Sequence, residues 1–398
     1  MADLVVKKVM WEGGTQVKPG TPLRLTAVVV NKEKTIYKDP VTVEFLIDAK
    51  PYKTASRVGH IYPGEGGVPI MLTVEDAWEA VQGDHMITAR IAPELSQPRC
   101  GRAGHARSAH VRVAEEILVP PAPAAAKGFN TLTFSDDFDS LHTIDTEATG
   151  EEGYHWYVTR PWGEGDLHYE DDYSIQDSVM HLHNINTWWN YGLCTIDTRH
   201  PVGYAFNRGY IEYRVRMKYS ADTGTVTKIR VPAVWSLPTT SIWGDTLKKK
   251  HHCSVELDWL EYWGDKYDMP DFFSVCLHEK DHDPEVPKEQ WPKPVVSPGG
   301  GVIGMQLGDY EWHTLSMQWD TGKLVTYFDG RMVHKIEYSP DGYPYPRPYN
   351  ARVGSFSHLD EQNMPIIIGG ASDYPMEVDW IRVWSASEEP MLRQEVDE

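Results

Sequence analysis

The chain has 398 residues, and its 58 acidic and 38 basic residues give a formal net charge of −20. A field of that sign disfavours nucleic acid and anionic membrane surfaces as partners. The sequence contains no run of about 18 apolar residues, so no membrane insertion is expected. The length is sufficient for more than one domain with a substantial core.

The aromatic residues are mostly amphipathic, with 15 Trp and 21 Tyr against 9 Phe. Rings of this kind stack an apolar face on a sugar while a polar edge stays in water. The same residues can also build a Trp-rich β core. The composition therefore favours a carbohydrate ligand without establishing one.

The N-terminal part, 1–117, shows short strand patterns at even spacing, separated by turn sequences such as Lys18-Pro19-Gly20. This spacing is typical of an immunoglobulin-like β-sandwich. The predicted strands are 4–11, 23–31, 41–47, 68–74, 86–91 and 109–113. The order of motifs loosely resembles bacterial cell-adhesion-related sandwich modules. No catalytic pattern occurs here, so an accessory or binding module is predicted.

A segment rich in Pro and Ala, 118–128, follows this module. Such a segment is expected to be semi-extended and solvated, and we place the domain boundary in it. Because the predicted tether is solvated, we expect 129–398 to act on soluble substrate without the module.

The larger part of the chain, 129–386, again carries strand patterns and no long amphipathic helix, and an acidic tail, 387–398, follows it. Its clearest strands are 209–217, 312–319, 324–328, 332–336 and 378–384, with Asp329-Gly330 as a hairpin turn. Two packed antiparallel sheets are predicted. The predicted fold class is all-β: an antiparallel β-jelly-roll sandwich of the concanavalin-like kind, preceded by a smaller immunoglobulin-like β-sandwich.

One strand pattern, Val255-Glu256-Leu257-Asp258-Trp259-Leu260-Glu261-Tyr262-Trp263, carries three carboxylates. Strict alternation places Glu256 and Asp258 on one face of a sheet. It would turn Glu261 into the apolar face, where an unpaired carboxylate is costly. A β-bulge at Trp259-Leu260 would return Glu261 to the face of the other two carboxylates and carry Trp263 there as well.

With the bulge, the two glutamates are roughly 13 Å apart along the backbone at about 3.3 Å per residue, and their side chains can lean together. That approaches the carboxyl separation of roughly 5–5.5 Å that retaining glycosidases need. One carboxylate would attack the anomeric carbon, while the other, protonated, would donate to the leaving oxygen. Asp258 lies between them and can separate their pKa values. A solvent-exposed acidic strand is the alternative that this pattern leaves open.

Further motifs resemble glycoside hydrolase family 16, which contains laminarinases, lichenases, agarases and carrageenases. In the family's order, over 130–385, they are Phe134-Ser135-Asp136-Asp137-Phe138-Asp139, Asn207-Arg208-Gly209-Tyr210-Ile211-Glu212-Tyr213-Arg214, Val231-Pro232-Ala233-Val234-Trp235-Ser236-Leu237-Pro238, the carboxylate strand, Tyr310-Glu311-Trp312-His313-Thr314, Tyr327-Phe328-Asp329-Gly330 and Val378-Asp379-Trp380-Ile381-Arg382-Val383. The resemblance implies an endo-acting retaining β-glycosidase on a jelly-roll scaffold.

The resemblance also implies the roles of the three carboxylates. Glu256 matches the family's nucleophile, Glu261 its acid/base and Asp258 its assisting carboxylate. Double displacement through these residues also predicts transglycosylation at high substrate concentration.

Four further residues are predicted to bind substrate. By the resemblance, Trp235 stacks near the cleavage point, Trp162 is an upstream platform and His278 is a cleft histidine. A purely structural His278 is the alternative. Trp263, which the bulge carries to the same face, completes this group.

No cofactor is required by this chemistry. Many family members hold a structural calcium ion between the opening strand and the Val378-Asp379-Trp380 strand, and Asp379 fits that position. Cys100, Cys194, Cys253 and Cys276 lack metal-ligand spacing and are expected to be thiols. A hairpin turning near Tyr267-Asp268 would place Cys253 opposite a residue near His282 rather than opposite Cys276.

Two segments beside the carboxylate strand bear on the substrate. The basic run Lys248-Lys249-Lys250-His251-His252 would either meet an anionic sugar or be a solvated loop. The stretch 279–308 is longer than a minimal hairpin connection, and long loops on a rigid sandwich give such clefts their specificity.

The predicted function is hydrolysis of a polysaccharide, which would be a β-glucan, a galactan or a bacterial exopolysaccharide. The alternatives are a non-catalytic carbohydrate-binding or adhesion protein and a depolymerase component of a larger assembly such as a phage. We expect a monomer at an extracellular or cell-surface location. Residues 1–6 match a strand pattern and show no signal peptide. We therefore expect either that a signal peptide was removed or that the protein leaves its cell by another route, such as on a phage particle.

Overall fold

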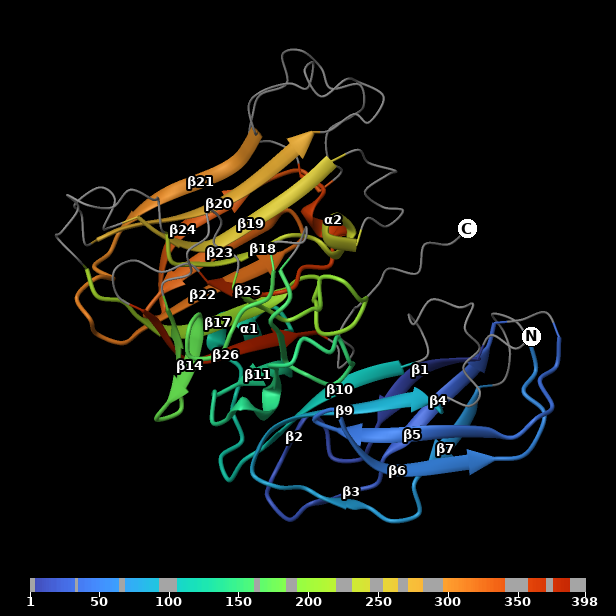
Figure 1. Ribbon diagram of the computed structural model, residues 1–398. Helices are drawn as coiled ribbons and strands as arrows, with labels where there is room; N and C mark the ends of the chain where they lie inside the picture. The colour runs from blue at the N-terminus through green and yellow to red at the C-terminus, as the bar shows by residue number, and fades with distance from the viewer. Residues whose placement is uncertain are drawn as a thin grey trace.

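The computed structural model describes residues 4–32, 35–63, 69–92, 106–160, 165–183, 192–219, 231–243, 253–263, 271–281, 296–340, 357–369 and 375–386. These residues form mostly antiparallel sheets in two units joined by 114–130 (Figure 1), and only the short strands β2 and β12 form parallel pairs among the described strands. The predicted all-β fold class is confirmed. The described helices are short: α1 (Ala122–Ala125), α2 (Thr239–Trp243) and the 3₁₀ turns η1 (Leu141–Thr143) and η5 (Leu359–Glu361).

The smaller unit is a β-sandwich. One sheet has the order β1 (Leu4–Met10), β4 (Thr26–Asn31), β7 (Ile70–Thr73). The facing sheet has the order β2 (Gln16–Val17), β10 (Ala106–Val113), β9 (Gly83–Ile91), β5 (Val41–Ile47), β6 (Lys50–Arg57), and β3 (Pro22–Leu23) pairs with β8 (Trp78–Glu79). Buried side chains of both sheets, such as Val29, Phe45 and Val111, form one core. The immunoglobulin-like wiring stays a prediction.

The larger unit is a sandwich of two longer sheets. The first has the order β14 (Tyr173–Gln176), β15 (Val179–Leu182), β26 (Met376–Ser385), β17 (Gly209–Arg216), β22 (His313–Asp320), β23 (Lys323–Phe328), β24 (Arg331–Glu337), and β11 (Thr131–Asp136) also pairs with β26. The second has the order β12 (Ile144–Asp145), β13 (Trp156–Tyr157), β16 (Leu193–Cys194), β25 (Ile367–Gly369), β18 (Ala233–Ser236), β19 (Cys253–Tyr262), β20 (Phe272–Asp281), β21 (Val296–Gly304).

One core lies between these two sheets. It contains Val215 from β17 and Leu257 and Trp259 from β19, all nearly inaccessible to water. The Tyr213 hydroxyl of β17 donates to the Trp259 carbonyl at 3.1 Å, so a hydrogen bond also joins the sheets. The predicted two-layer jelly-roll architecture is therefore the observed one, and β19 lies in the middle of its sheet.

Most predicted strands overlap observed ones, and the exceptions have a physical cause. The sequence pattern missed β6, an edge strand whose side chains are mostly exposed and so lack apolar alternation. The stretch 279–308 was expected to be a long loop, but β20 extends to Asp281 and β21 occupies 296–304. The run of Gly299, Gly300 and Gly301 hid β21, since strands are normally depleted in glycine.

The expectation of a semi-extended linker is wrong over 122–125, which is helical, whereas most of 118–128 is exposed to solvent as expected. Its alanines form α1, and Ala124 is completely buried against Phe129, Tyr210 and Trp384 of the larger unit. Leu118 exchanges two hydrogen bonds with the side chain of Gln16, at 2.9 and 3.1 Å. The segment therefore packs against both units. The domain limits assigned from the sequence stay a prediction.

A buried polar network also joins the units. The Asp84 carboxylate on β9 accepts from His110 and Arg112 of β10, at 3.1 Å each, and from the Ser135 hydroxyl on β11. Arg112 also donates to Asp137 at 2.6 Å. Although burial opposes ionisation, the hydrogen bond from His110 and the charge of Arg112 hold the pKa of Asp84 well below its usual range. The two units thus share a desolvated ion-pair cluster.

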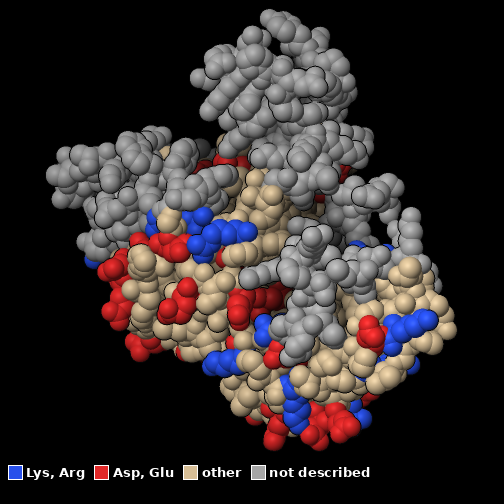
Figure 2. Space-filling view, turned by 45° about the vertical axis from the view of Figure 1, so that its right-hand side comes forward, with Lys and Arg blue, Asp and Glu red and all other residues tan. Residues whose placement is uncertain are grey.

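The acidic composition is visible on the surface. On the face in Figure 2, acidic side chains gather along the side of the larger unit and at the base of the smaller one. Within the described ranges no helix has the length and apolar character needed to cross a membrane.

Candidate active site

The predicted β-bulge is present in β19. Toward β18, Val234 pairs with Leu260 and Trp235 pairs with Asp258, so Trp259 is the additional residue. The ladder to β20 shifts in the same place, between Asp258 and Glu261. Trp259 and Leu260 are both buried between the sheets. Two successive residues on the inner face return Glu261 to the outer face, as the cost of burying a carboxylate requires.

Asp258 forms an ion pair with His278. The Nε2 atom of His278 lies 3.1 Å from Oδ2 of Asp258, which is only 3% exposed, and Nδ1 lies 3.6 Å from the Cys276 sulfur. Burial disfavours the imidazolium, but the hydrogen bonds to Asp258 and Cys276, together with the charge of Asp258, outweigh it and raise the pKa of His278 to about 10. In the ladder, His278 is opposite Glu256. It is therefore a cation placed among the three carboxylates.

The pKa of the Glu261 carboxyl group is raised toward neutral pH. Burial first, and then the charge of Asp258, raises the pKa of Glu261 to about 7, and the charge of Glu256 adds to the same effect. The Ser274 hydroxyl donates to Oε2 of Glu261 at 3.3 Å, and the indole of Trp263 donates to Ser274 at 3.0 Å. At neutral pH this residue is protonated in a large share of molecules, as a general acid needs to be.

The predicted aromatic residues lie in different surroundings. Trp263 directly follows β19 and contacts Glu261 through Ser274. Trp235 is opposite Asp258 in the ladder, but it is 8% exposed and packs in a cluster with Leu237 and α2. Most of its ring is therefore covered.

Five sequence-based predictions lie outside the described residues: Trp162, the basic run 248–252, the turn at Tyr267-Asp268, Cys100 and the tail 387–398.

Sequence reasoning missed Ser274 and gave Cys276 no place in the site. Both lie on β20, where Phe273, Val275 and Leu277 are buried and the intervening residues are partly exposed. This alternation was a usable signal. A hairpin register centred near residue 267 pairs Ser274 with Glu261 and Cys276 with Asp258.

The residues around Asp379 do not fit a calcium ion. Its carboxylate Oδ2 accepts from Nη1 of Arg214 at 2.5 Å, so a guanidinium already neutralises this carboxylate and would repel a second cation. Asp258, Cys276 and His278 also bring donor atoms within 4.8 Å of one another. Both nitrogens of His278 already contact the other two, which accounts for this group without an ion.

The cysteines follow the predicted pattern where they are described. Cys194 and Cys276 form no disulfide within these ranges, and burial raises the pKa of the Cys194 thiol to about 12. Cys253 is opposite Asp281, one position from the residue expected.

The sequence matches no protein-family model and no curated protein. Among solved structures, the chain is similar to the laminarinase catalytic domain of Thermotoga maritima, at 16% identity and a TM-score of 0.39, over 64% of this chain and 98% of that one. It is also similar to a GlcNAcα1-4Gal-releasing endo-β-galactosidase from Clostridium perfringens, at 16% identity and a TM-score of 0.42, over 68% of this chain and 64% of that one. At these values the likeness carries no activity over to this chain.

Proposed function

We propose that the chain is an endo-acting retaining β-glycosidase that hydrolyses a polysaccharide. The observation that carries the proposal is the bulge in β19, which joins Glu261, with its pKa near 7, to the face of Glu256 and Asp258. One acid kept protonated beside carboxylates that can ionise is the arrangement that double displacement requires.

In the proposed first step, Glu256 attacks the anomeric carbon and the glycosidic C–O bond breaks. The leaving oxygen takes the proton of Glu261, and a glycosyl ester forms on Glu256. In the second step, Glu261, now ionised, removes a proton from water, which attacks the anomeric carbon and releases Glu256. Asp258 and His278 form an ion pair beside the two glutamates, and the charges of both partners act on the pKa of Glu261. Neither step needs a metal ion or another cofactor.

The substrate classes that we propose are β-glucans, galactans and bacterial exopolysaccharides. Trp263 adjoins the proposed acid and offers a ring on which a sugar can stack. Because such polymers do not enter cells, we infer action at an extracellular or cell surface, a phage particle included. A monomer is sufficient, since all the named groups come from one chain.

Glu256→Gln tests the function. An amide cannot form the glycosyl ester, so release of reducing ends should fall by on the order of 10³-fold or more. Wild type is first screened on β-glucans, agar, carrageenan and bacterial exopolysaccharides, with reducing ends and product length as the readout. Glu311→Gln, which changes an exposed glutamate of the same unit, is the matched control and should keep full activity.

Two outcomes would count against the proposal. If Glu256→Gln kept the activity of Glu311→Gln, the nucleophile would be another group. If wild type bound one of these polymers but released no reducing ends from any of them, the chain would be the alternative, a non-catalytic carbohydrate-binding protein.

A further inference from the structure

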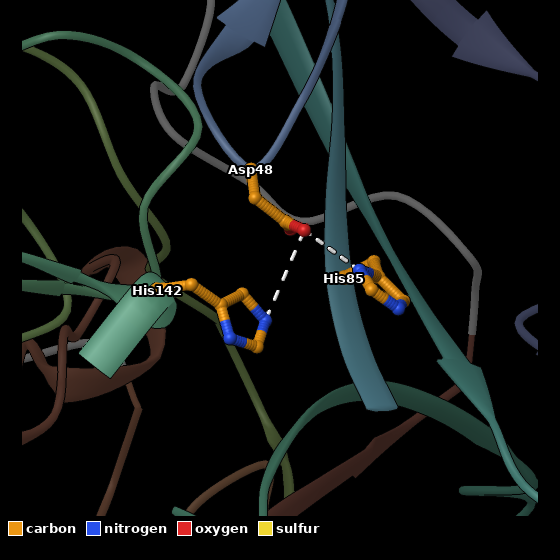
Figure 3. A group of neighbouring side chains, drawn as sticks. All are labelled: Asp48, His85 and His142. Atoms are coloured by element: carbon orange, nitrogen blue, oxygen red, sulfur yellow. Dashed lines mark hydrogen bonds and ion pairs between the residues drawn. The ribbon is translucent and has the colours of Figure 1, made fainter. Parts of the chain in front are cut away.

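Three potential metal ligands meet where the two units touch, far in sequence from the candidate active site. Asp48 lies in the turn between β5 and β6, His85 on β9, and His142 on η1 of the larger unit. Figure 3 shows the Asp48 carboxylate directed toward both imidazole rings. Its Oδ2 atom is 2.7 Å from Nδ1 of His85 and 3.8 Å from Nε2 of His142. Among the residues that the structure describes, no further His, Cys, Asp or Glu joins this group.

The outer nitrogens of both rings already have partners. Nε2 of His85 faces the Val81 carbonyl at 2.9 Å, and Nδ1 of His142 contacts the Ser140 hydroxyl. Nε2 of His142, the nitrogen directed at Asp48, also faces the Asp84 carbonyl at 3.3 Å, a long contact that a bound metal ion would replace. A carbonyl only accepts, so Nε2 of His85 carries a proton. If the His85 ring is neutral, the lone pair of its Nδ1 faces the Oδ2 atom of Asp48, and the two repel each other. Either a second proton or a metal ion must lie between them. Metal-bound histidines characteristically donate their other nitrogen to a carbonyl in this way.

The carboxylate is held rigidly. Asp48 and Ala49 both have positive φ, 51° and 59°, and form a two-residue hairpin turn. The Asp48 amide donates to the Met86 carbonyl, and Oδ1 accepts from the Met86 amide, each at 2.9 Å. Gly153 of the larger unit packs on this turn so closely that a Cβ would lie 3.0 Å from the Ala49 nitrogen. Only Oδ2 remains directed at the histidines.

We propose that Asp48, His85 and His142 form a site for a divalent transition metal of the zinc type, which ties the smaller unit to the larger. Two imidazoles and a carboxylate are a donor set that zinc accepts. Tetrahedral bonds of about 2.0–2.2 Å place neighbouring ligand atoms about 3.3 Å apart, and the two observed spacings bracket that value. The His142 side chain is 29% exposed, so a water molecule can reach the fourth position.

The test uses the full chain after dialysis against a chelator. Titration calorimetry with Zn²⁺ should show one ion bound per chain. Co²⁺ should give tetrahedral absorption without a thiolate charge-transfer band, which separates this site from the cysteines. His85→Ala and His142→Ala should each weaken Zn²⁺ binding by about 10-fold or more. His60→Ala, which removes an exposed histidine of the smaller unit, should bind as wild type does.

Zn²⁺ should also raise the melting temperature of wild type and of His60→Ala, but not of His142→Ala. Because His142 is partly exposed, its loss leaves a foldable chain, and far-UV circular dichroism checks this. Absence of saturable Zn²⁺ binding to wild type would overturn the proposal and leave a protonated His85 paired with Asp48. Binding that persists unchanged in both His85→Ala and His142→Ala would overturn it as well.

Discussion

Glu261 is the residue whose protonation state controls the proposed reaction. Its pKa is raised because burial and the charge of Asp258 both disfavour the carboxylate, while the positive charge of His278 opposes them. The acid form is the active one, so activity is present below the raised pKa and is lost as the pH rises through it. The balance of neighbouring charges thus sets the alkaline limit of activity.

We expect kcat/KM of wild type to fall on the alkaline side with an apparent pKa of about 7. His278→Gln removes the opposing positive charge, so the alkaline limb should move to higher pH. The measurement is kcat/KM against pH on a soluble oligosaccharide that the screen identifies.

Glu261→Gln is the matched variant for that experiment. With an aryl glycoside whose leaving group needs no proton, it should keep cleaving, and the limb near pH 7 should disappear. An alkaline limb that stays in place in this variant would assign the titration to a different group.

At the scale of an element, β19 combines a core face with a face that carries the carboxylates proposed to be catalytic. Leu257, Trp259 and Leu260 anchor the strand between the sheets, and the bulge separates them from Glu261. Because a central strand has neighbours on both sides, the bulge is fixed by two ladders. The carboxylates are therefore presented from a rigid support.

The bulge predicts the stereochemical outcome. Because Glu256 and Glu261 lie on one face of one strand, we expect their carboxyl groups to be closer than the roughly 6.5–9.5 Å that an inverting enzyme needs for a water molecule. We expect retention of the anomeric configuration, and transglycosylation at high substrate concentration, because an acceptor sugar can replace water. Proton NMR of the first-formed anomer, recorded before mutarotation, measures this. An inverted first product would rule out Glu256 and Glu261 as a nucleophile and acid pair.

At the scale of the whole molecule, the two units are joined by groups that are charged and desolvated. Asp84 and Arg112 come from the smaller unit and Asp137 from the larger, and the Asp84 side chain is 5% exposed. Removing one partner of such a cluster leaves an uncompensated buried charge. The smaller unit is therefore expected to stabilise the larger one.

Arg112→Ala should destabilise the chain by about 3–5 kcal/mol, because Asp84 and Asp137 lose their shared cation. Lys53→Ala, which removes an exposed ion pair with Asp76, is the control and should change little. Denaturant unfolding of both variants gives the comparison.

The fragment 129–398 should likewise melt at a lower temperature than the full chain. An Arg112→Ala protein as stable as Lys53→Ala, or a fragment as stable as the full chain, would show that the interface contributes little to folding.

Local rules determined several features from the sequence alone. Alternation with period two predicted the strands on both sides of Asp329-Gly330, and that turn is where β23 and β24 meet. The bulge at Trp259-Leu260 was predictable because it rests on one local conflict, between strand periodicity and the cost of burying Glu261.

Only the tertiary structure decided which distant residues meet. The pairing of Asp258 with His278 depends on the register of two strands, and the group of Asp48, His85 and His142 depends on how two units dock. Ala124 was expected in solvent because its segment is rich in Pro and Ala, yet it is buried against Phe129, Tyr210 and Trp384. Backbone propensity and turn chemistry act over a few residues, whereas these contacts form only when segments far apart in the chain pack together.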